Sequence, residues 1–328
     1  IGTAKVTVTA GTPVLNARTF SGLLLDPHDA IAGAVDATFT ATGRAASVRM
    51  TTGTRVSRFW LYLPAGSNTG SRFLGFGTLT LTRNGDGTVS ASFASSGDLI
   101  GGVLQPRKAP SVAGRYNAAL GSIDAVIPGG GYLFVNTLSA SGAFLIGRLP
   151  DGKVFSASTS VRDDGTIAFH SIVRRGVNPP EIVAGELVFA DLTATDLTGE
   201  VAWAKPVQAP GVRGLHLGGV DTLLTVNGCQ WKRQPLPAGA GTLSLSGGNL
   251  AADEDANVAI TAGRPTVPTG SAKSWVANRK YGIFSARVKV PGLPLPVAGA
   301  GVYLPKSNSA WGFFPGTTEG GRIELTTR

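Results

Sequence analysis

The sequence contains very little cysteine and no long apolar run. Cys229 is the single cysteine among 328 residues, which excludes an internal disulfide framework and any zinc site built from several cysteines. We expect Cys229 to be a small buried apolar residue, with a free thiol and an intermolecular link as alternatives. No apolar run approaches the roughly 20 residues of a membrane-spanning helix, so we expect no membrane span.

Charged residues are also scarce, at 15% of the chain against about 25% in ordinary soluble domains. A surface with so few charges is solvated by Ser, Thr, Asn and Gly, as in many secreted and cell-surface β proteins. The net charge of +9 favours acidic partners, among them acidic polysaccharide, an anionic envelope and nucleic acid. The chain opens at Ile1 without a signal peptide, which predicts a processed product or a piece of something longer.

Lysine and arginine never form a run, and no aromatic stacking platform is interleaved with them. We therefore expect no specific nucleic-acid binding. The charges are better interpreted as solvated strand edges and loop tips that oppose aggregation. The nearest basic clusters are Arg107-Lys108, Arg174-Arg175, Lys232-Arg233 and Arg279-Lys280.

Short alternating or apolar segments fill the stretch from Pro128 to Pro206 and define the expected fold class. Turn pairs separate them, because Gly supplies the positive φ that tight hairpins need. No apolar stripe at helical spacing continues for ten residues without Gly or Pro. The sequence therefore predicts an all-β protein of two or three tandem antiparallel β-barrel or β-sandwich modules joined by short Pro/Gly linkers. The turn pairs are Ser141-Gly142, Asp151-Gly152, Asp164-Gly165 and Thr198-Gly199.

Internal similarity suggests where the modules begin and end. FSGLLL, from Phe20, matches GRYNAAL, from Gly114, and each is followed by two strand-like segments around a small-residue turn. The copies are about 95 residues apart, which indicates a duplicated β module. The breaks QPRKAPS and PVQAPG then predict a β module at 13–110, a second at 111–209, and a third at 210–328 that may pack with the second.

Residues 1–12 are expected to form a strand and a linker that belong to a preceding immunoglobulin-like module. AKVTVT alternates like a strand, and a lone strand has to pair with something. The partner is upstream sequence, a neighbouring sheet or another copy of the molecule. The candidate assembly strand comprises Lys5, Val6, Thr7, Val8 and Thr9.

No group of residues has the spacing that catalysis or metal binding requires. The histidines His28, His170 and His216 are not spaced as metal ligands; His170 is expected in a strand and His28 in a turn. Asn84-Gly85-Asp86-Gly87 lacks the further ligands of a calcium loop and predicts a hairpin turn. We expect a protein with no catalytic residue, no metal site and no cofactor, so not an enzyme. Asp124, Glu186 and Glu200 are the candidate acids for glycosidase chemistry. Glu186 and Glu200 lie within alternating strands, and we expect their side chains to face solvent.

Exposed aromatic side chains on β modules often stack on sugar rings, so the tryptophans are candidates for glycan binding. Trp231, beside Lys232 and Arg233, and Trp275, in a polar stretch near Lys273, are the best of them. Packing is the alternative for both. Trp60, Trp203 and Trp311 lie in apolar, strand-like contexts, and we expect them in the core.

The middle and last units contain a set of turn and aromatic motifs: Gly114-x-Tyr116, GGGYLFVNTLSASGAFLIGRLPDGKVFSAS, Gly185-Glu186, Trp203-Ala204-Lys205-Pro206, YGIFSARVKV, GAGVYLP and WGFFPGTTEGGRIEL. In these motifs the units resemble the β-rich C-terminal modules of large secreted multidomain surface proteins of Verrucomicrobia and related bacteria. Such modules follow arrays of immunoglobulin-like domains. The resemblance implies a location outside the cell or on its surface and a role in adhesion, display or assembly; it implies no catalytic residues.

Two functions follow from these observations. The first is a non-catalytic extracellular structural or interaction protein that serves surface display, adhesion or filament or sheath assembly. Its partners would be other copies of itself, other surface proteins or acidic polysaccharide. The alternative is a carbohydrate-binding module of a larger secreted enzyme.

Overall fold

The structure of the protein is a computed structural model, and every described strand belongs to one of three antiparallel sheets. The all-β prediction is therefore confirmed. A single short helix occurs in the described chain, η1 (Pro305–Ser307), and no helix there is both long and apolar enough to cross a membrane. The structure describes residues 19–53, 55–107, 112–122, 127–138, 142–174, 179–234, 236–261, 264–266 and 270–328.

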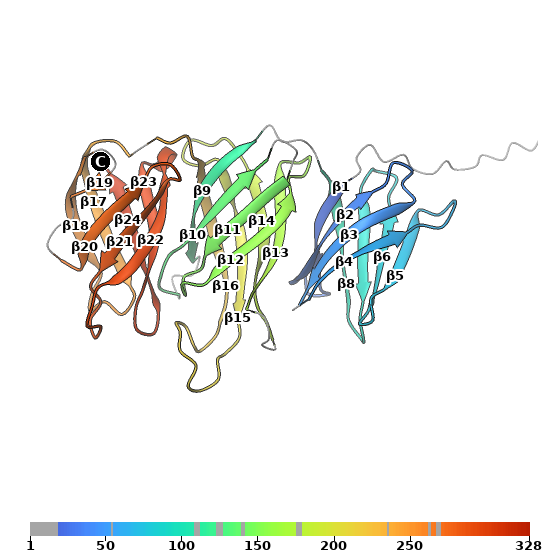
Figure 1. The fold of residues 1–328 in the computed structure, drawn as a ribbon, viewed down its shortest axis with the longest axis horizontal. Coiled ribbons are helices and arrows are strands. Elements are labelled where there is room, and N and C mark those ends of the chain that lie inside the picture. The colour runs from blue at the N-terminus through green and yellow to red at the C-terminus, as the bar shows by residue number, and fades with distance from the viewer. Residues whose placement is uncertain are drawn as a thin grey trace, which may run out of the picture. The chain divides into compact units, whose positions relative to one another are not determined.

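The first sheet has eight strands in the order β4-β3-β2-β1-β8-β7-β6-β5. Strands that follow each other in the chain pair with each other, except β4 and β5, and β1 pairs with β8, so the sheet curves round into a barrel-like form whose two ends are β4 and β5 (Figure 1). Its strands are β1 (Thr19–Leu25), β2 (Ile31–Phe39), β3 (Ala45–Thr52), β4 (Arg55–Tyr62), β5 (Thr69–Phe73), β6 (Thr78–Arg83), β7 (Val89–Ala94) and β8 (Leu99–Pro106).

The second sheet repeats this winding, in the order β12-β11-β10-β9-β16-β15-β14-β13. Its first and last strands, β9 and β16, pair side by side. The two segments that matched in the sequence, from Phe20 and from Gly114, thus begin equivalent strands of two similar sheets. The strands are β9 (Gly114–Ser122), β10 (Gly131–Thr137), β11 (Gly142–Arg148), β12 (Val154–Ser160), β13 (Thr166–Arg174), β14 (Glu181–Phe189), β15 (Leu197–Lys205) and β16 (Val220–Gln230).

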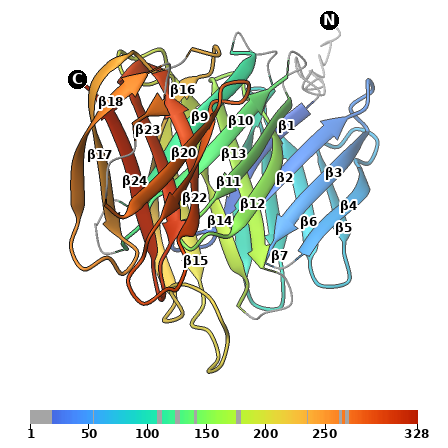
Figure 2. The same ribbon diagram turned by 60° about the vertical axis from the view of Figure 1, so that its left-hand side comes forward.

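The third sheet has the order β19-β18-β17-β24-β23-β22-β21-β20 and again pairs its first strand with its last (Figure 2). The described chain forms two compact units, one around the first sheet and one containing the second and third. The strands are β17 (Gly239–Gly247), β18 (Glu254–Thr261), β19 (Arg264–Pro265), β20 (Ala272–Asn278), β21 (Ile283–Val288), β22 (Val297–Leu304), β23 (Ser309–Pro315) and β24 (Gly320–Thr327).

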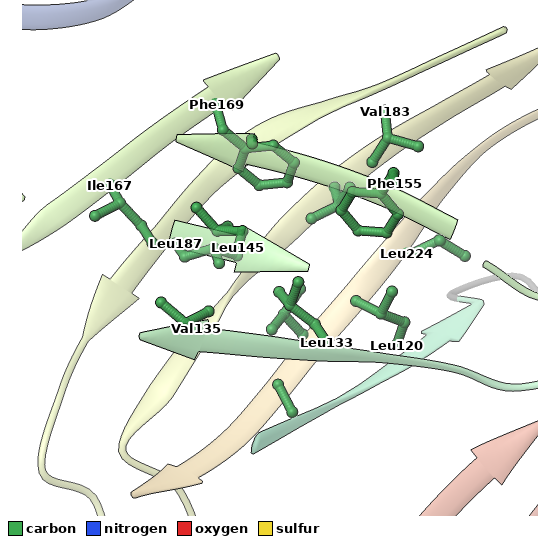
Figure 3. Packing of buried hydrophobic residues seen from close by; sticks show 14 of the residues in the cluster. Leu120, Leu133, Val135, Leu145, Phe155, Ile167, Phe169, Val183, Leu187 and Leu224 are labelled. Carbon is green, nitrogen blue, oxygen red and sulfur yellow. The ribbon is translucent and has the colours of Figure 1, made fainter. Parts of the chain in front are cut away.

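The interior of each sheet is filled by the apolar residues of its alternating strands. In β10, for example, Leu133 and Val135 are fully buried while their neighbours are only partly buried, as period-two alternation requires. Figure 3 shows these side chains meeting Leu145, Phe155 and Phe169 from three other strands. The rings of Phe155 and Phe169 stack with centroids 6.1 Å apart. The second sheet therefore encloses a packed core.

The second and third sheets pack against each other within one unit. Ala119 and Cys229 from the second sheet form a small apolar cluster with Val302 and Leu304 from β22. Asn117, fully buried in β9, donates hydrogen bonds from Nδ2 to the carbonyl of Gly282 at 2.8 Å and to that of Tyr303 at 3.3 Å. These contacts fix β9 to the third sheet, and Cys229 is the buried apolar residue that was expected.

Two sequence interpretations need correction. Thr198-Gly199 is not a turn: both residues lie in β15, and a Cβ on Gly199 would approach Glu186 O to 2.3 Å, so close strand contact explains this glycine.

The break PVQAPG is no boundary between modules either, because it lies between β15 and β16 of the same sheet. Pro and Gly mark both kinds of loop alike. The second sheet thus continues to Gln230, beyond the expected limit at 209, and the assembly strand Lys5–Thr9 lies outside the described residues.

Candidate functional site

Trp231, the first expected glycan-binding residue, is buried. Its side chain is 7% exposed and packs in the core of the third sheet, with its ring 6.2 Å from that of Tyr303. Gly282 lies against the indole, because a Cβ at that position would be 2.4 Å from Trp231 Cδ2. Lys232 and Arg233 are exposed, but the face of Trp231 is not open to a sugar ring, so this expectation is corrected.

Trp275 lies on β20, not in a loop, and is half-buried. Its ring stacks on Phe284 at 3.9 Å, and its Nε1 donates a hydrogen bond to the hydroxyl of Tyr303 at 2.8 Å. Burial raises the pKa of Tyr303 to about 12, so that hydroxyl keeps its proton at neutral pH. Both the ring and the N–H of Trp275 thus already have partners inside the third sheet, and packing accounts for this residue.

Trp60, which was expected in the core, is 48% exposed. The phase of β4 explains the difference: Leu61 is buried, so its neighbours Trp60 and Tyr62 point outward. Phe73 on β5 is 69% exposed and Tyr62 is 66% exposed. We call Trp60, Tyr62 and Phe73 the aromatic face. Of the other two tryptophans, Trp203 is fully buried as expected, and Trp311 is half-buried against the second sheet.

The aromatic face spans the two ends of the first sheet. A Cβ on Gly70 would be 2.5 Å from Tyr62 O, so β5 passes close beside β4 at that point. Two residues along β5, Arg72 donates a hydrogen bond from its guanidinium to Trp60 O at 2.6 Å and lies over the ring of Phe59 at 5.6 Å. This arginine fixes the two strands to each other, so the three aromatic side chains share one outward surface.

Positive charge accompanies this surface. Arg58 is exposed and alternates in phase with Trp60 and Tyr62 on β4, so it points to the same side. Arg72 precedes Phe73 on β5 and lies over Phe59, so it points to the other side. Arginine stacks on planar groups and binds carboxylates with two parallel hydrogen bonds. Aromatic rings beside Arg58 can therefore hold an acidic ligand that also has apolar faces.

A chain of buried ionic groups lies at one end of the second sheet. Lys205 Nζ is 2.7 Å from Asp151 Oδ2, and Lys153 Nζ contacts Asp151 Oδ2 at 3.5 Å and also forms an ion pair with Glu181. The carboxylates of Asp151 and Glu181 are completely buried. Trp203 Nε1 donates a hydrogen bond to Glu181 Oε1 at 3.3 Å. Each buried charge thus lies beside an opposite charge, which offsets the free-energy cost of removing the charged group from water.

The acids considered for catalysis do not form an enclosed pair. Glu186 and Glu200 are direct cross-strand partners on β14 and β15, and both side chains are exposed. Arg162 Nη1 lies 2.8 Å from Glu186 Oε1 and neutralises it. Asp124 lies outside the described residues. An exposed, neutralised carboxylate does not have the environment of a glycosidase acid.

The three histidines have different surroundings. His170 is buried in β13, and burial lowers its pKa to about 4. His28 is in a turn, where its N–H donates to Asp26 Oδ1 at 2.8 Å. His216 Nε2 accepts a hydrogen bond from the Gly320 N–H at 3.2 Å. No group of three or more potential metal ligands occurs among the residues that the structure describes.

Comparisons with known proteins add little to this picture. No protein-family model matches the chain, and no curated protein matches it. Among solved structures, the chain is similar to transferrin binding protein B, mutant Trp-176-Ala, from Haemophilus parasuis Hp5, with a TM-score of 0.22 and 9% identity over 95% of this chain and 76% of the other. It is also similar to CghA with Sch210972, with a TM-score of 0.12 and 9% identity over 94% and 87%. TM-scores this low carry no argument.

Proposed function

We propose that the protein is a non-catalytic extracellular interaction protein that binds acidic polysaccharide through the aromatic face. The observation that carries the proposal is the exposure of Trp60, Tyr62 and Phe73, at 48%, 66% and 69%, on β4 and β5, the two end strands of the first sheet. Soluble proteins rarely expose contiguous large apolar groups without a binding role. Trp60 and Tyr62 also combine an apolar ring with a polar group, which suits contact with a wet partner.

An acidic glycan is the partner class that the charges favour. Sugar rings present C–H faces to aromatic side chains, while a carboxylate would meet Arg58 beside the rings. The net charge of +9 attracts a polyanion over a longer range. The low charged fraction of the chain and its resemblance to surface modules support an extracellular location. Enzymatic activity is not part of the proposal.

The test compares polysaccharide binding by the full chain and two variants, using affinity electrophoresis in gels that contain polygalacturonate or neutral galactan. Trp60→Ala should weaken binding to polygalacturonate by about fivefold, because one lost ring contact is worth roughly 1 kcal/mol. Phe144→Ala is the matched control, since Phe144 is 44% exposed on β11 of the second sheet. Equal retardation of the wild-type chain in both gels, or no effect of Trp60→Ala, would refute the proposal.

A further inference from the structure

We propose that a cavity between the second and third sheets binds a sugar acid, a small ligand with one carboxylate and several hydroxyl groups. The cavity has a volume of about 370 Å³, within the range of small-molecule sites. It lies in the unit that contains both sheets, apart from the aromatic face of the first sheet. The residues that carry the argument are Ser122, Ser246, Asp253, Trp311 and Arg322, and the other walls are glycines, Ile127 and Pro128.

Arg322 supplies the positive charge of this cavity. It points outward from β24, and its guanidinium lies 5.2 Å from the centre of the Trp311 ring, which holds the guanidinium plane in place. Its Nε is buried and has no hydrogen-bond partner among the residues described, and the Oε2 atom of Glu324 is 3.9 Å away, too far for a hydrogen bond. A carboxylate in the cavity would give this N–H the acceptor that a buried donor needs.

Trp311 supplies an apolar wall. A Cβ on Gly130 would be 2.9 Å from Trp311 Nε1, so the indole lies directly against the backbone that leads into β10, where only glycine leaves room. Gly121 borders the far edge of the ring, at 3.7 Å from the corresponding Cβ position. The Trp311 Nε1 atom is buried there and has no acceptor in the described part of the chain. The ring position is thus fixed by packing beside the cavity.

The remaining polar groups select for hydroxyls. Ser122 Oγ is the third buried polar atom of this cavity for which the described residues offer no partner. Asp253 is exposed at the rim, where its Oδ1 accepts a hydrogen bond from the Gly247 N–H at 3.3 Å. A carboxylate at the rim repels a second negative charge and accepts hydrogen bonds from hydroxyls. One arginine opposite one aspartate therefore favours a monoacid rich in hydroxyls over phosphate or a dicarboxylate.

The experiment uses the full chain and monomeric probes, and it measures dissociation constants by ligand-observed NMR titration. Galacturonate is expected to bind at least about tenfold more tightly than galactose, which has the same ring without the carboxylate, and than inorganic phosphate. Arg322→Gln should weaken galacturonate binding by about tenfold or more, as loss of a charge-assisted hydrogen bond predicts. Equal binding of the three probes, or unchanged binding by Arg322→Gln, would overturn the proposal.

Two further variants keep the test decisive. If Arg322→Gln does not fold, Asp253→Ala takes its place: Asp253 is exposed, so folding should persist while the loss of its hydroxyl contacts weakens galacturonate binding. Phe144→Ala should leave galacturonate binding by the cavity unchanged, because Phe144 lies on β11 and does not line the cavity. Loss of polygalacturonate retention in Trp60→Ala, together with loss of galacturonate binding in Arg322→Gln, would support both proposals. Failure of either one can therefore be distinguished from failure of the other.

Discussion

Lys205 and Asp151 form a buried ion pair in which Nζ lies 2.7 Å from Oδ2 and both side chains are almost completely shielded from water. Lys205 comes from the end of β15, and Asp151 comes from the turn between β11 and β12. Lys205 Nζ also donates a hydrogen bond to Leu215 O at 2.5 Å. This pair joins two segments of the second sheet that are far apart in the chain, and it is the contact between the motifs PDGK and WAKP.

Removing one partner of this pair should destabilise the unit strongly. Lys205→Met leaves the Asp151 carboxylate in the interior with only Lys153, at 3.5 Å, as an opposite charge. We expect a loss of about 3–5 kcal/mol in the free energy of unfolding, measured by chemical denaturation. Glu324→Gln, which removes a half-exposed pair with Arg322, should cost less than about 1 kcal/mol. Recovery of stability in Lys205→Met/Asp151→Leu would confirm the cause, and a small loss in Lys205→Met alone would contradict it.

His170 should make the protein sensitive to mild acid. Its folded-state pKa of about 4 lies below the ordinary 6.5 because burial disfavours the charged form. Between these values the unfolded state binds more protons, so stability is complete above pH 6.5 and falls as pH drops toward 4. At about 1.4 kcal/mol per pKa unit, the total loss is about 3 kcal/mol.

The matching variant is His170→Leu, which is similar in volume and does not titrate. Denaturation at pH 7 and pH 4 should show that the variant loses about 3 kcal/mol less on acidification than the wild type does. Neither ring nitrogen of His170 has a hydrogen-bond partner among the described residues, so the substitution should not lower stability at pH 7. Parallel losses in both proteins would disprove the role of His170.

Gly282 should tolerate no side chain. It has φ of 67°, and a Cβ there would be 2.4 Å from both Asn117 Nδ2 and Trp231 Cδ2. Gly282→Ala should therefore cost about 2–4 kcal/mol, from overpacking and left-handed strain together. Gly66→Ala is the control, because Gly66 has φ of 75° with no atom within 4 Å of the Cβ position and should cost only about 1–2 kcal/mol. Equal shifts of the two denaturation midpoints would argue against the steric explanation.

Cys229 should be unreactive in the folded protein. It is 2% exposed between the second and third sheets, and burial raises the pKa of its thiol. Maleimide at neutral pH should therefore label no cysteine in the native chain and one after denaturation, as mass spectrometry would show. Ser71→Cys, at an exposed position on β5, should react rapidly and serves as the control. Rapid labelling of the native wild-type chain would be inconsistent with this structure.

The alternation of small apolar residues and the Asp-Gly turns was enough to predict the all-β fold. Asp164-Gly165 joins β12 to β13, and Asn84-Gly85-Asp86-Gly87 joins β6 to β7, each with a glycine at positive φ. Alternation and turn type depend only on residues that are neighbours in the chain, so both can be predicted from the sequence. They do not show whether a loop joins two strands of one sheet or two separate modules. The sequence alone therefore predicts a module boundary at PVQAPG, where the structure has a loop within the second sheet.

The candidate sites were harder to predict, because burial depends on contacts between distant segments. Trp231 follows the last residue of β16 among polar neighbours, yet the chain reverses at Arg233, with φ of 60°, and the ring enters the core of the third sheet. Asp151 and Lys205 are 54 residues apart, and nothing in their local context indicates that they meet. The exposure of Trp60, by contrast, could be predicted from the sequence. If Leu61 is placed facing the core, the alternation of β4 puts the side chain of Trp60 on the outer face of the sheet.

The pairing of first and last strands in every sheet has a mechanical consequence. Phe20 faces Pro106, Tyr116 faces Gln230 and Gly241 faces Thr327, so the chain enters and leaves each module at the same end of two antiparallel neighbours. Tension applied through the chain would pull these strands apart one hydrogen-bonded pair at a time, as a zip opens. Single-molecule extension should therefore open each module at low force and let it close again on release, so that a surface protein built this way would lengthen under load before it broke.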